Sequence, residues 1–144
     1  MPMFITLCVT DPADVVNWYE RALGFASMFR GPVIHLRRRK YQDILIVGAT
    51  DQMPATSGGP RLSFNADGEV DAIAARAASV PACRSSRVHA PIDTPWNTRE
   101  VTIIDPAAHV LVFTSRRATP DHALEASWRA RFEQGRHGGG DGNR

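Results

Sequence analysis

The side chains that could carry chemistry in this chain are few and lie far apart in the sequence. The five histidines form no pair at i and i+4 and no tight cluster, so they lack the spacing of a metal site. We expect each of them to be an ordinary surface or core histidine. They are His35, His89, His109, His122 and His137.

The two cysteines also predict no site. Cys8 and Cys83 are too few and too far apart in sequence for a disulfide framework or a zinc knuckle. Cys8 has no residue near it in the sequence that would favour a reactive thiolate, and buried thiols behave as small hydrophobic groups. We expect both cysteines to be reduced and unreactive.

Two carboxylates, Asp93 and Glu100, flank Trp96. In a dry cleft either could act as a general base, but charged groups on a loop or at a strand end are more often solvated. Trp96 follows Pro95 in a loop, where a large ring is not obviously needed for a core. Stacking on a ligand or partner and packing in the core both remain open for this ring.

Composition predicts one ordinary globular domain. The chain has 144 residues, 43% hydrophobic and 22% charged, with a net charge of +2. No apolar run approaches the roughly 20 residues that cross a bilayer, and residues 1–8 contain no basic leader, so we expect a cytoplasmic protein. The basic run 37–40 could hold phosphates, but a solvated hairpin tip is favoured. A single run without interleaved aromatic residues argues against nucleic-acid binding.

A strand and a helix begin the pattern that must position these residues. Asp11 and Pro12 favour a helix start, and Gly24 suits a left-handed helix end. Between them the apolar residues recur at helical spacing, so Trp18 and Tyr19 are expected in the core. The strands expected around this helix are residues 3–9, 25–29, 33–37 and 41–47.

The same order of elements then repeats after a Pro- and Gly-rich linker at residues 48–60. A strand at 61–66 and a helix with apolar residues from Val70 to Ala77 precede three further β-prone pieces. Those pieces are residues 83–88, 99–104 and 110–114. The repeat, at about 55 residues, predicts an α+β fold of two βαβββ modules, module one at 3–50 and module two at 60–116.

The last segment differs from both modules of the predicted domain 1–117. Residues 118–134 are expected to form a helix in which Leu124, Trp128 and Phe132 make an apolar stripe. Packing against its own domain is favoured over packing on a partner subunit. The glycine-rich residues 135–144 predict a disordered tail.

Two sequence runs resemble one known family. The run WYERALGF at 18–25, after Asp11 and Pro12, resembles an opening helix signature of the glyoxalase, bleomycin-resistance and extradiol dioxygenase (vicinal oxygen chelate) superfamily. The run PWNTRE at 95–100, with IDP at 104–106 and VLVF at 110–113, resembles the closing hairpin of bleomycin-resistance proteins. The resemblance covers about residues 3–116. It implies two modules whose curved sheets enclose a cleft, and dimers with clefts between subunits.

The resemblance also shows where the superfamily's enzymes hold a metal. Counting from Asp11, Asp67 and Asp105 places Phe4, Arg61 and Val112 at three of the four ligand positions, with the fourth within 44–47. Phenyl and aliphatic groups have no donor atom, and a guanidinium stays protonated, so we expect no metal and no other cofactor. The family's turn residues Asp-Gly-Asn are replaced by Ala107-Ala108-His109, and the glycine after the tryptophan by Asn97, which predicts an altered turn and loop.

These observations predict a protein that binds rather than transforms its ligand. We expect it to sequester a drug- or antibiotic-like small molecule, neutral or anionic because the chain is basic, in a cleft between modules or between the subunits of a homodimer. The expected ligand-binding residues are Trp96, Phe4, Arg61, Phe29, Ser63, Val112 and Tyr41. The alternative is an enzyme of the same fold, cofactorless or metal-dependent, with Glu100, Asp93 or His109 as its acid or base. A third reading is an interaction protein that docks through the C-terminal helix.

Overall fold

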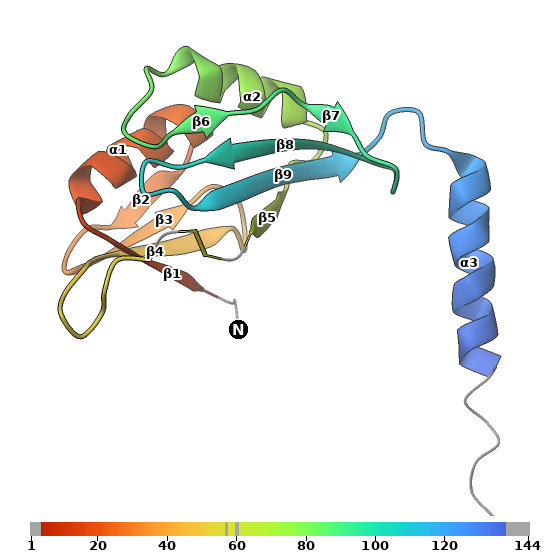
Figure 1. Cartoon of the computed structure of the whole chain (residues 1–144), viewed down its shortest axis with the longest axis horizontal. Helices are drawn as coiled ribbons and strands as arrows, with labels where there is room; N and C mark the ends of the chain where they lie inside the picture. The colour runs from red at the N-terminus through yellow and green to blue at the C-terminus, as the bar shows by residue number, and fades with distance from the viewer. Residues whose placement is uncertain (1–3, 57, 60, 138–144) are drawn as a thin grey trace, which may run out of the picture.

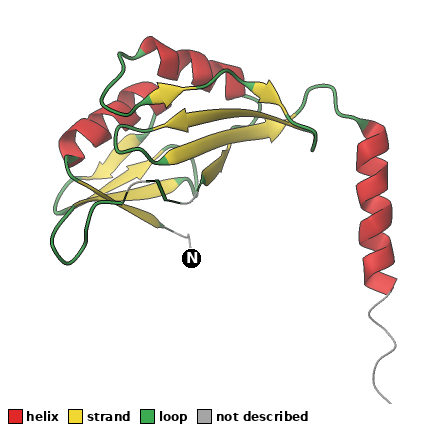
Figure 2. Cartoon of the chain, in the orientation of Figure 1, coloured by secondary structure: helices red, strands yellow, loops and turns green. Residues whose placement is uncertain are grey.

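The computed structural model describes residues 4–56, 58–59 and 61–137 (Figure 1). Strands and helices alternate to give two β-sheets, with helices α1 and α2 beside each other and a third helix apart from them (Figure 2). Met3 and residue 60, where the two predicted modules begin, lie outside the described residues, as do residues 138–144 of the predicted tail.

Module one has the predicted order of one strand, one helix and three strands. It consists of β1 (Ile5–Val9), α1 (Pro12–Leu23), β2 (Ala26–Phe29), β3 (Val33–Arg37) and β4 (Asp43–Gly48). These strands form sheet A in the order β1-β4-β3-β2, with β1 parallel to β4 and the other neighbours antiparallel. Gly24 ends α1 at φ 72°, the left-handed conformation that glycine adopts without steric cost.

Module two repeats this topology, which confirms the duplication. It consists of β5 (Leu62–Asn65), α2 (Val70–Ser79), β6 (Arg87–Val88), β7 (Ile92–Asp93), β8 (Thr98–Ile104) and β9 (Val110–Arg116). Sheet B has the order β5-β9-β8-β6, and β7 pairs with the other end of β8. The predicted strand at 83–88 is reduced to two residues, because a turn closes from Cys83 to Ser86 and Arg84 has a positive φ of 51°.

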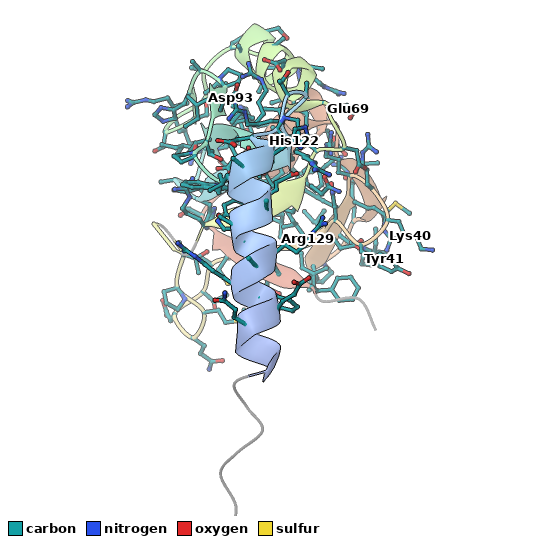
Figure 3. The ribbon with its side chains drawn as sticks, turned by 90° about the vertical axis from the view of Figure 1, so that its right-hand side faces the viewer. Lys40, Tyr41, Glu69, Asp93, His122 and Arg129 are labelled. Atoms are coloured by element: carbon teal, nitrogen blue, oxygen red, sulfur yellow. The ribbon has the colours of Figure 1, made fainter. Side chains whose placement is uncertain are left out.

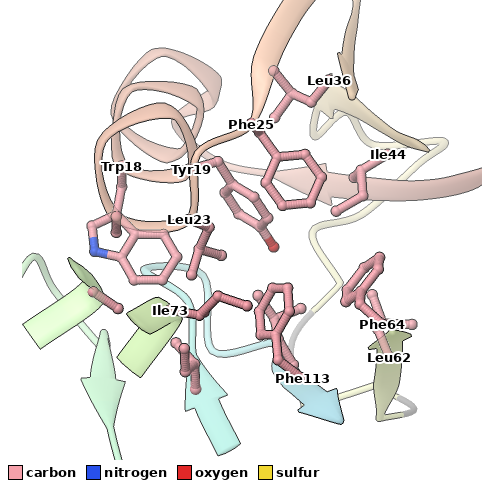
Figure 4. Packing of buried hydrophobic residues seen from close by; sticks show 14 of the residues in the cluster. Trp18, Tyr19, Leu23, Phe25, Leu36, Ile44, Leu62, Phe64, Ile73 and Phe113 are labelled. Atoms are coloured by element: carbon pink, nitrogen blue, oxygen red, sulfur yellow. The ribbon is translucent and has the colours of Figure 1, made fainter. Parts of the chain in front are cut away.

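One hydrophobic core joins the two modules. Helices α1 and α2 lie side by side, with α1 packed against sheet A and α2 packed against sheet B (Figure 1). Aromatic rings run from Phe25 through Phe64 to Phe113, with centroid separations of 6.1 and 5.3 Å (Figure 4). Trp18 and Tyr19 are buried in this core, as predicted. The opposite side of each sheet, which we call its outer face, carries no helix of the core.

The basic run 37–40 forms the predicted hairpin turn between β3 and β4, but Arg38 and Arg39 are not solvated, so that part of the prediction was wrong. The side chain of Arg38 is only 8% exposed, and its guanidinium carbon lies 5.3 Å from the centroid of the Phe113 ring. Arg39 forms ion pairs of 2.9 Å with Asp67 and 2.6 Å with Glu69. The acidic residues just before α2 therefore hold this turn against module two, which the order of the sequence did not reveal.

The C-terminal helix α3 (His122–His137) does not pack against its own domain, contrary to the prediction. It stands apart from both sheets in Figure 1. The helix begins four residues later than predicted, after Pro120, and continues through residues 135–137, which were expected in the tail. No helix among the described residues is long and apolar enough to cross a membrane.

Candidate functional site

The outer face of sheet B carries a group of polar side chains. Side chains alternate along a strand, and Leu62, Val101 and Phe113 point into the core, so their neighbours point outward. Strand register then places Ser63 beside Val112 and Thr102, and Asn65 beside Thr114 and Glu100. The remaining polar outward residues are Arg61, Thr98, Arg116 beside Thr98, and Arg87 beside Ile104. This face combines four hydroxyls with one carboxylate, one amide and three guanidinium groups.

Glu100 lies at the centre of this face and is the most organised group on it. Its Oε1 accepts hydrogen bonds from Trp96 Nε1 at 3.0 Å, Thr98 Oγ1 at 2.7 Å and Thr114 Oγ1 at 3.3 Å. Partial burial acts to raise the pKa of the Glu100 carboxyl, but these hydrogen bonds and the charge of Arg61 outweigh it and lower that pKa. Every hydrogen bond to Glu100 from the described residues ends on Oε1, so Oε2 is left to accept a bond from a ligand.

Trp96 lies in the turn before β8 and is 53% exposed, so core packing is not its role. The turn itself is rigid. Thr94 is buried and hydrogen-bonds across the turn to Thr98, and Asn97 is buried with a positive φ of 64°. Asparagine tolerates this conformation, so it replaces the glycine expected here at little cost. The Trp96 ring is thus presented on a fixed support and is oriented by Glu100.

Three more of the predicted binding residues lie on sheet B. Arg61 is exposed and makes a long hydrogen bond of 3.4 Å to Thr102 Oγ1, so its guanidinium keeps donors for a ligand. Ser63 is exposed beside Val112. Val112 has the predicted orientation but is only 3% exposed, and it offers little surface to a ligand.

Of the other three predicted residues, one lies at the junction between the two modules and two lie on sheet A. Tyr41 is 67% exposed on the β3–β4 turn, and with Ser63 it lines an open groove of about 620 Å³ between the two modules. Figure 3 shows Lys40 and Tyr41 on this turn. Phe4 and Phe29 are exposed on the outer face of sheet A, where the Phe4 ring meets His35 edge-on at 5.5 Å. The chain therefore brings Trp96, Arg61 and Ser63 to one face, and Phe4 and Phe29 to another.

A second polar cluster, on sheet A, was missed by sequence reasoning. Asp43 Oδ1 accepts from Arg37 Nε at 2.7 Å and lies 2.6 Å from His35 Nε2, and the Asp43 side chain is fully buried. Burial acts to raise the pKa of Asp43, but the bonds from Arg37 and His35 outweigh it and lower that pKa. The i, i+2 spacing of His35 and Arg37 on one strand was the available signal.

A third network is buried between the modules. Asp105 Oδ2 accepts from Tyr19 Oη at 2.8 Å and lies 2.8 Å from His109 Nδ1, and His109 Nε2 lies 2.8 Å from Thr56 Oγ1. Both Asp105 and His109 are almost completely buried. Asp93, the other carboxylate beside Trp96, is paired through Oδ1 with Arg99 at 2.9 Å and through Oδ2 with Arg117 at 3.6 Å. Of the three acid-base candidates, only Glu100 combines partial exposure with a free oxygen.

Comparison with solved structures shows which fold this is. A glyoxalase/bleomycin resistance protein/dioxygenase from Nocardioides superposes with a TM-score of 0.62 at 17% identity, over 84% of this chain and 86% of that one. A glyoxalase/bleomycin resistance protein from a Streptomyces species gives 0.62 at 24% identity, over 78% and 97%. A bleomycin resistance determinant encoded on the transposon Tn5 gives 0.62 at 18% identity, over 81% and 98%.

The chain has the glyoxalase/bleomycin resistance/dioxygenase fold. This confirms the fold that the two sequence runs predicted. No protein-family model matches the chain, and no curated protein matches it in sequence.

The metal positions of the glyoxalase/bleomycin resistance/dioxygenase fold hold no suitable donors in this chain. The fourth position is Leu45 or Val47, because Ile44 and Ile46 point into the core. Phe4, Arg61, Val112 and either Leu45 or Val47 then occupy the four places, and none supplies a lone pair for a divalent ion. Among the described residues, no three His, Cys, Asp or Glu side chains lie close enough to hold a metal ion. The residues present therefore do not fit the metal.

The closing turn at residues 105–109 contains a strained residue. Ala108 adopts a positive φ of 67°, a conformation that costs a non-glycine residue roughly 1–2 kcal/mol. Asp105 offsets this strain, because its Oδ1 accepts hydrogen bonds from the backbone N–H groups of Ala107 at 2.9 Å and His109 at 2.8 Å. The predicted distortion of this turn is thus local strain and not a different topology.

Proposed function

We propose that this chain binds and sequesters a small molecule on the outer face of sheet B, without transforming it. The observation that carries the proposal is the arrangement at Glu100, whose Oε1 is saturated by three donors while Oε2 is available beside the exposed Trp96 ring. A few fixed polar groups next to an aromatic surface are typical of small-molecule sites.

The chemistry of this face defines the class of ligand. A planar group would stack on Trp96, a hydrogen-bond donor would meet Glu100 Oε2, and an acceptor would meet Arg61. The charges of Glu100 and Arg61 cancel, and Arg116 is paired with Glu125, so a neutral or zwitterionic molecule fits better around Trp96 than a strongly anionic one. Drug- or antibiotic-like compounds of this kind are the ligands we propose, and one solved protein of this fold is named as a bleomycin resistance determinant.

The enzyme alternative has fewer supports. Of its three proposed acid-base groups, Asp93 is paired with Arg99, and His109 is buried in the Asp105 network. Glu100 alone remains, with its pKa lowered, which suits a hydrogen-bond acceptor better than a general acid.

We also propose that the protein is a cytoplasmic homodimer.

Replacing Trp96 with alanine is expected to weaken binding of a bleomycin-type drug about tenfold, because stacking and ring burial are lost. Isothermal titration of the wild type and the variant measures this change, with an anionic metabolite titrated in parallel. Met53→Ala is the matched control, since Met53 is also an exposed apolar side chain but lies in the loop after β4. Equal affinity in the Trp96→Ala variant and the wild type would contradict the assignment of this face.

A further inference from the structure

The outer face of sheet A carries several exposed apolar side chains beside its polar cluster. Phe29, Val33 and Phe4 are 60%, 40% and 42% exposed. Register places Phe29 beside His35 and Leu45, and Val33 beside Val47 and Cys8. The apolar residues lie around His35 and Thr6, with Asp43 and Arg37 at one end of the face, and none of the described helices covers them (Figure 1). A surface of this kind favours contact with another apolar surface.

Helix α3 carries a second uncovered apolar surface. Leu124, Trp128 and Phe132 recur every four residues and lie on one side of the helix. Trp128 is 39% exposed and Phe132 is 70% exposed. Its 16 residues make a helix only marginally stable in water when it packs on nothing. The stripe therefore requires a surface to stabilise the helix.

The direction in which α3 leaves the body is fixed by hydrogen bonds. Asn97 Nδ2 donates to the Asp121 carbonyl at 2.9 Å, and Asp121 N–H donates to Asn97 Oδ1 at 2.8 Å. Arg116 pairs with Glu125 in the first turn of the helix. Because Asn97 is itself buried, this pair of hydrogen bonds holds the start of α3 firmly. The helix consequently projects away from both sheets of its own chain (Figure 1).

We propose that α3 packs on the outer face of sheet A of a second copy of this chain, and that the second copy's helix does the same in return. The homodimer proposed above is assumed, and this contact adds the surfaces that form it. A second copy is the occupant because one chain offers both an apolar arm and an apolar face, each uncovered by the described residues. Two-fold symmetry then satisfies both surfaces at once.

The area available is sufficient for such a dimer. Four partly exposed rings, Trp128, Phe132, Phe4 and Phe29, would each bury roughly 100 Å², about half of what a full aromatic side chain buries. Symmetry doubles this to roughly 800 Å² before aliphatic neighbours such as Leu124, Val33 and Leu45 are added. A specific interface needs about 1,000 Å² in total.

Sedimentation equilibrium of the full chain tests the proposal. The wild type should have twice the chain mass of 15.8 kDa at micromolar concentration. Trp128→Glu combined with Phe132→Glu should raise the dimer dissociation constant at least about a hundredfold and give the monomer mass. Ala126→Glu combined with Ala130→Glu adds the same charge on the opposite side of α3 and should leave the dimer intact. Circular dichroism confirms that each variant is folded.

A variant on the outer face of sheet A distinguishes a contact between α3 and sheet A from a contact between two α3 helices. Phe29→Glu should dissociate the dimer as the α3 variant does, because both remove one side of the same interface. If only the α3 variant dissociates, the helices pair with each other and the proposal is wrong. A monomeric wild type, in which α3 folds back on its own chain, would also overturn it. If the dimer persists in both variants, the protein is a homodimer but α3 does not form its interface, and the proposal is wrong.

Discussion

Replacing Asp105 with alanine is expected to lower the free energy of unfolding by about 3–5 kcal/mol, measured by urea denaturation. The substitution removes the acceptor for Tyr19 Oη, for His109 Nδ1 and for the backbone N–H groups of Ala107 and His109. Each buried donor left without a partner costs about 1–3 kcal/mol. The strained turn at Ala108 loses its support in the same step.

Tyr19→Phe is the graded control for this network, since it removes a single hydrogen bond and should cost about 2 kcal/mol. Burial, followed by the charge of Asp105 and the hydrogen bond to it, raises the pKa of Tyr19 well above its ordinary value. The folded pKa therefore exceeds the unfolded one, so Tyr19 stabilises the protein fully below about pH 10 and loses that contribution as the pH rises further. The Tyr19→Phe variant should lack this alkaline loss. A cost below about 1 kcal/mol for Asp105→Ala would contradict the network's role.

Replacing Glu100 with alanine is expected to weaken ligand binding about 10- to 100-fold. The variant loses the acceptor Oε2 and also releases Trp96, whose indole N–H donates to Oε1 at 3.0 Å. A hydrogen bond to a charged group contributes about 1.5–3 kcal/mol, which corresponds to this range. Isothermal titration with the ligand that the wild type binds measures the effect.

Glu100→Gln separates charge from hydrogen bonding at the same position. Its amide oxygen can still accept from Trp96 and Thr98, so the ring keeps its orientation while the negative charge is lost. For a ligand with a cationic or N–H donor, this variant should bind with intermediate affinity. If alanine and glutamine variants both bind like the wild type, Glu100 is not part of the site.

The fold was predictable because its signals are local in the sequence. Asp11, Pro12 and Gly24 mark the ends of α1, and the second module repeats the order of elements. Contacts between distant segments were not predictable in this way. Arg38 is buried on Phe113, and Arg39 is paired with Glu69, only because the two modules share one core. The packing of α3 was predicted wrongly, since an apolar stripe indicates that a helix needs a surface but not which surface.

The candidate site was predictable in part. Trp96, Arg61 and Ser63 were expected at the site and do share one face of sheet B, because strand alternation fixes the side on which each residue lies. The central position of Glu100 was not predicted. It depends on two hydroxyl donors, one from β8 and one from β9, and on one indole donor from the turn before β8. The burial of Val112 was missed for the same reason, because exposure depends on neighbouring strands.

The most direct test of the binding face is the two-dimensional ¹H–¹⁵N NMR spectrum of the labelled protein, recorded while a bleomycin-type drug is titrated. Saturable shifts should appear at the Trp96 indole N–H and at the backbone amides of Ser63, Glu100 and Thr114. Shifts confined to the outer face of sheet A, or to the helices, would contradict the assignment of the ligand to sheet B.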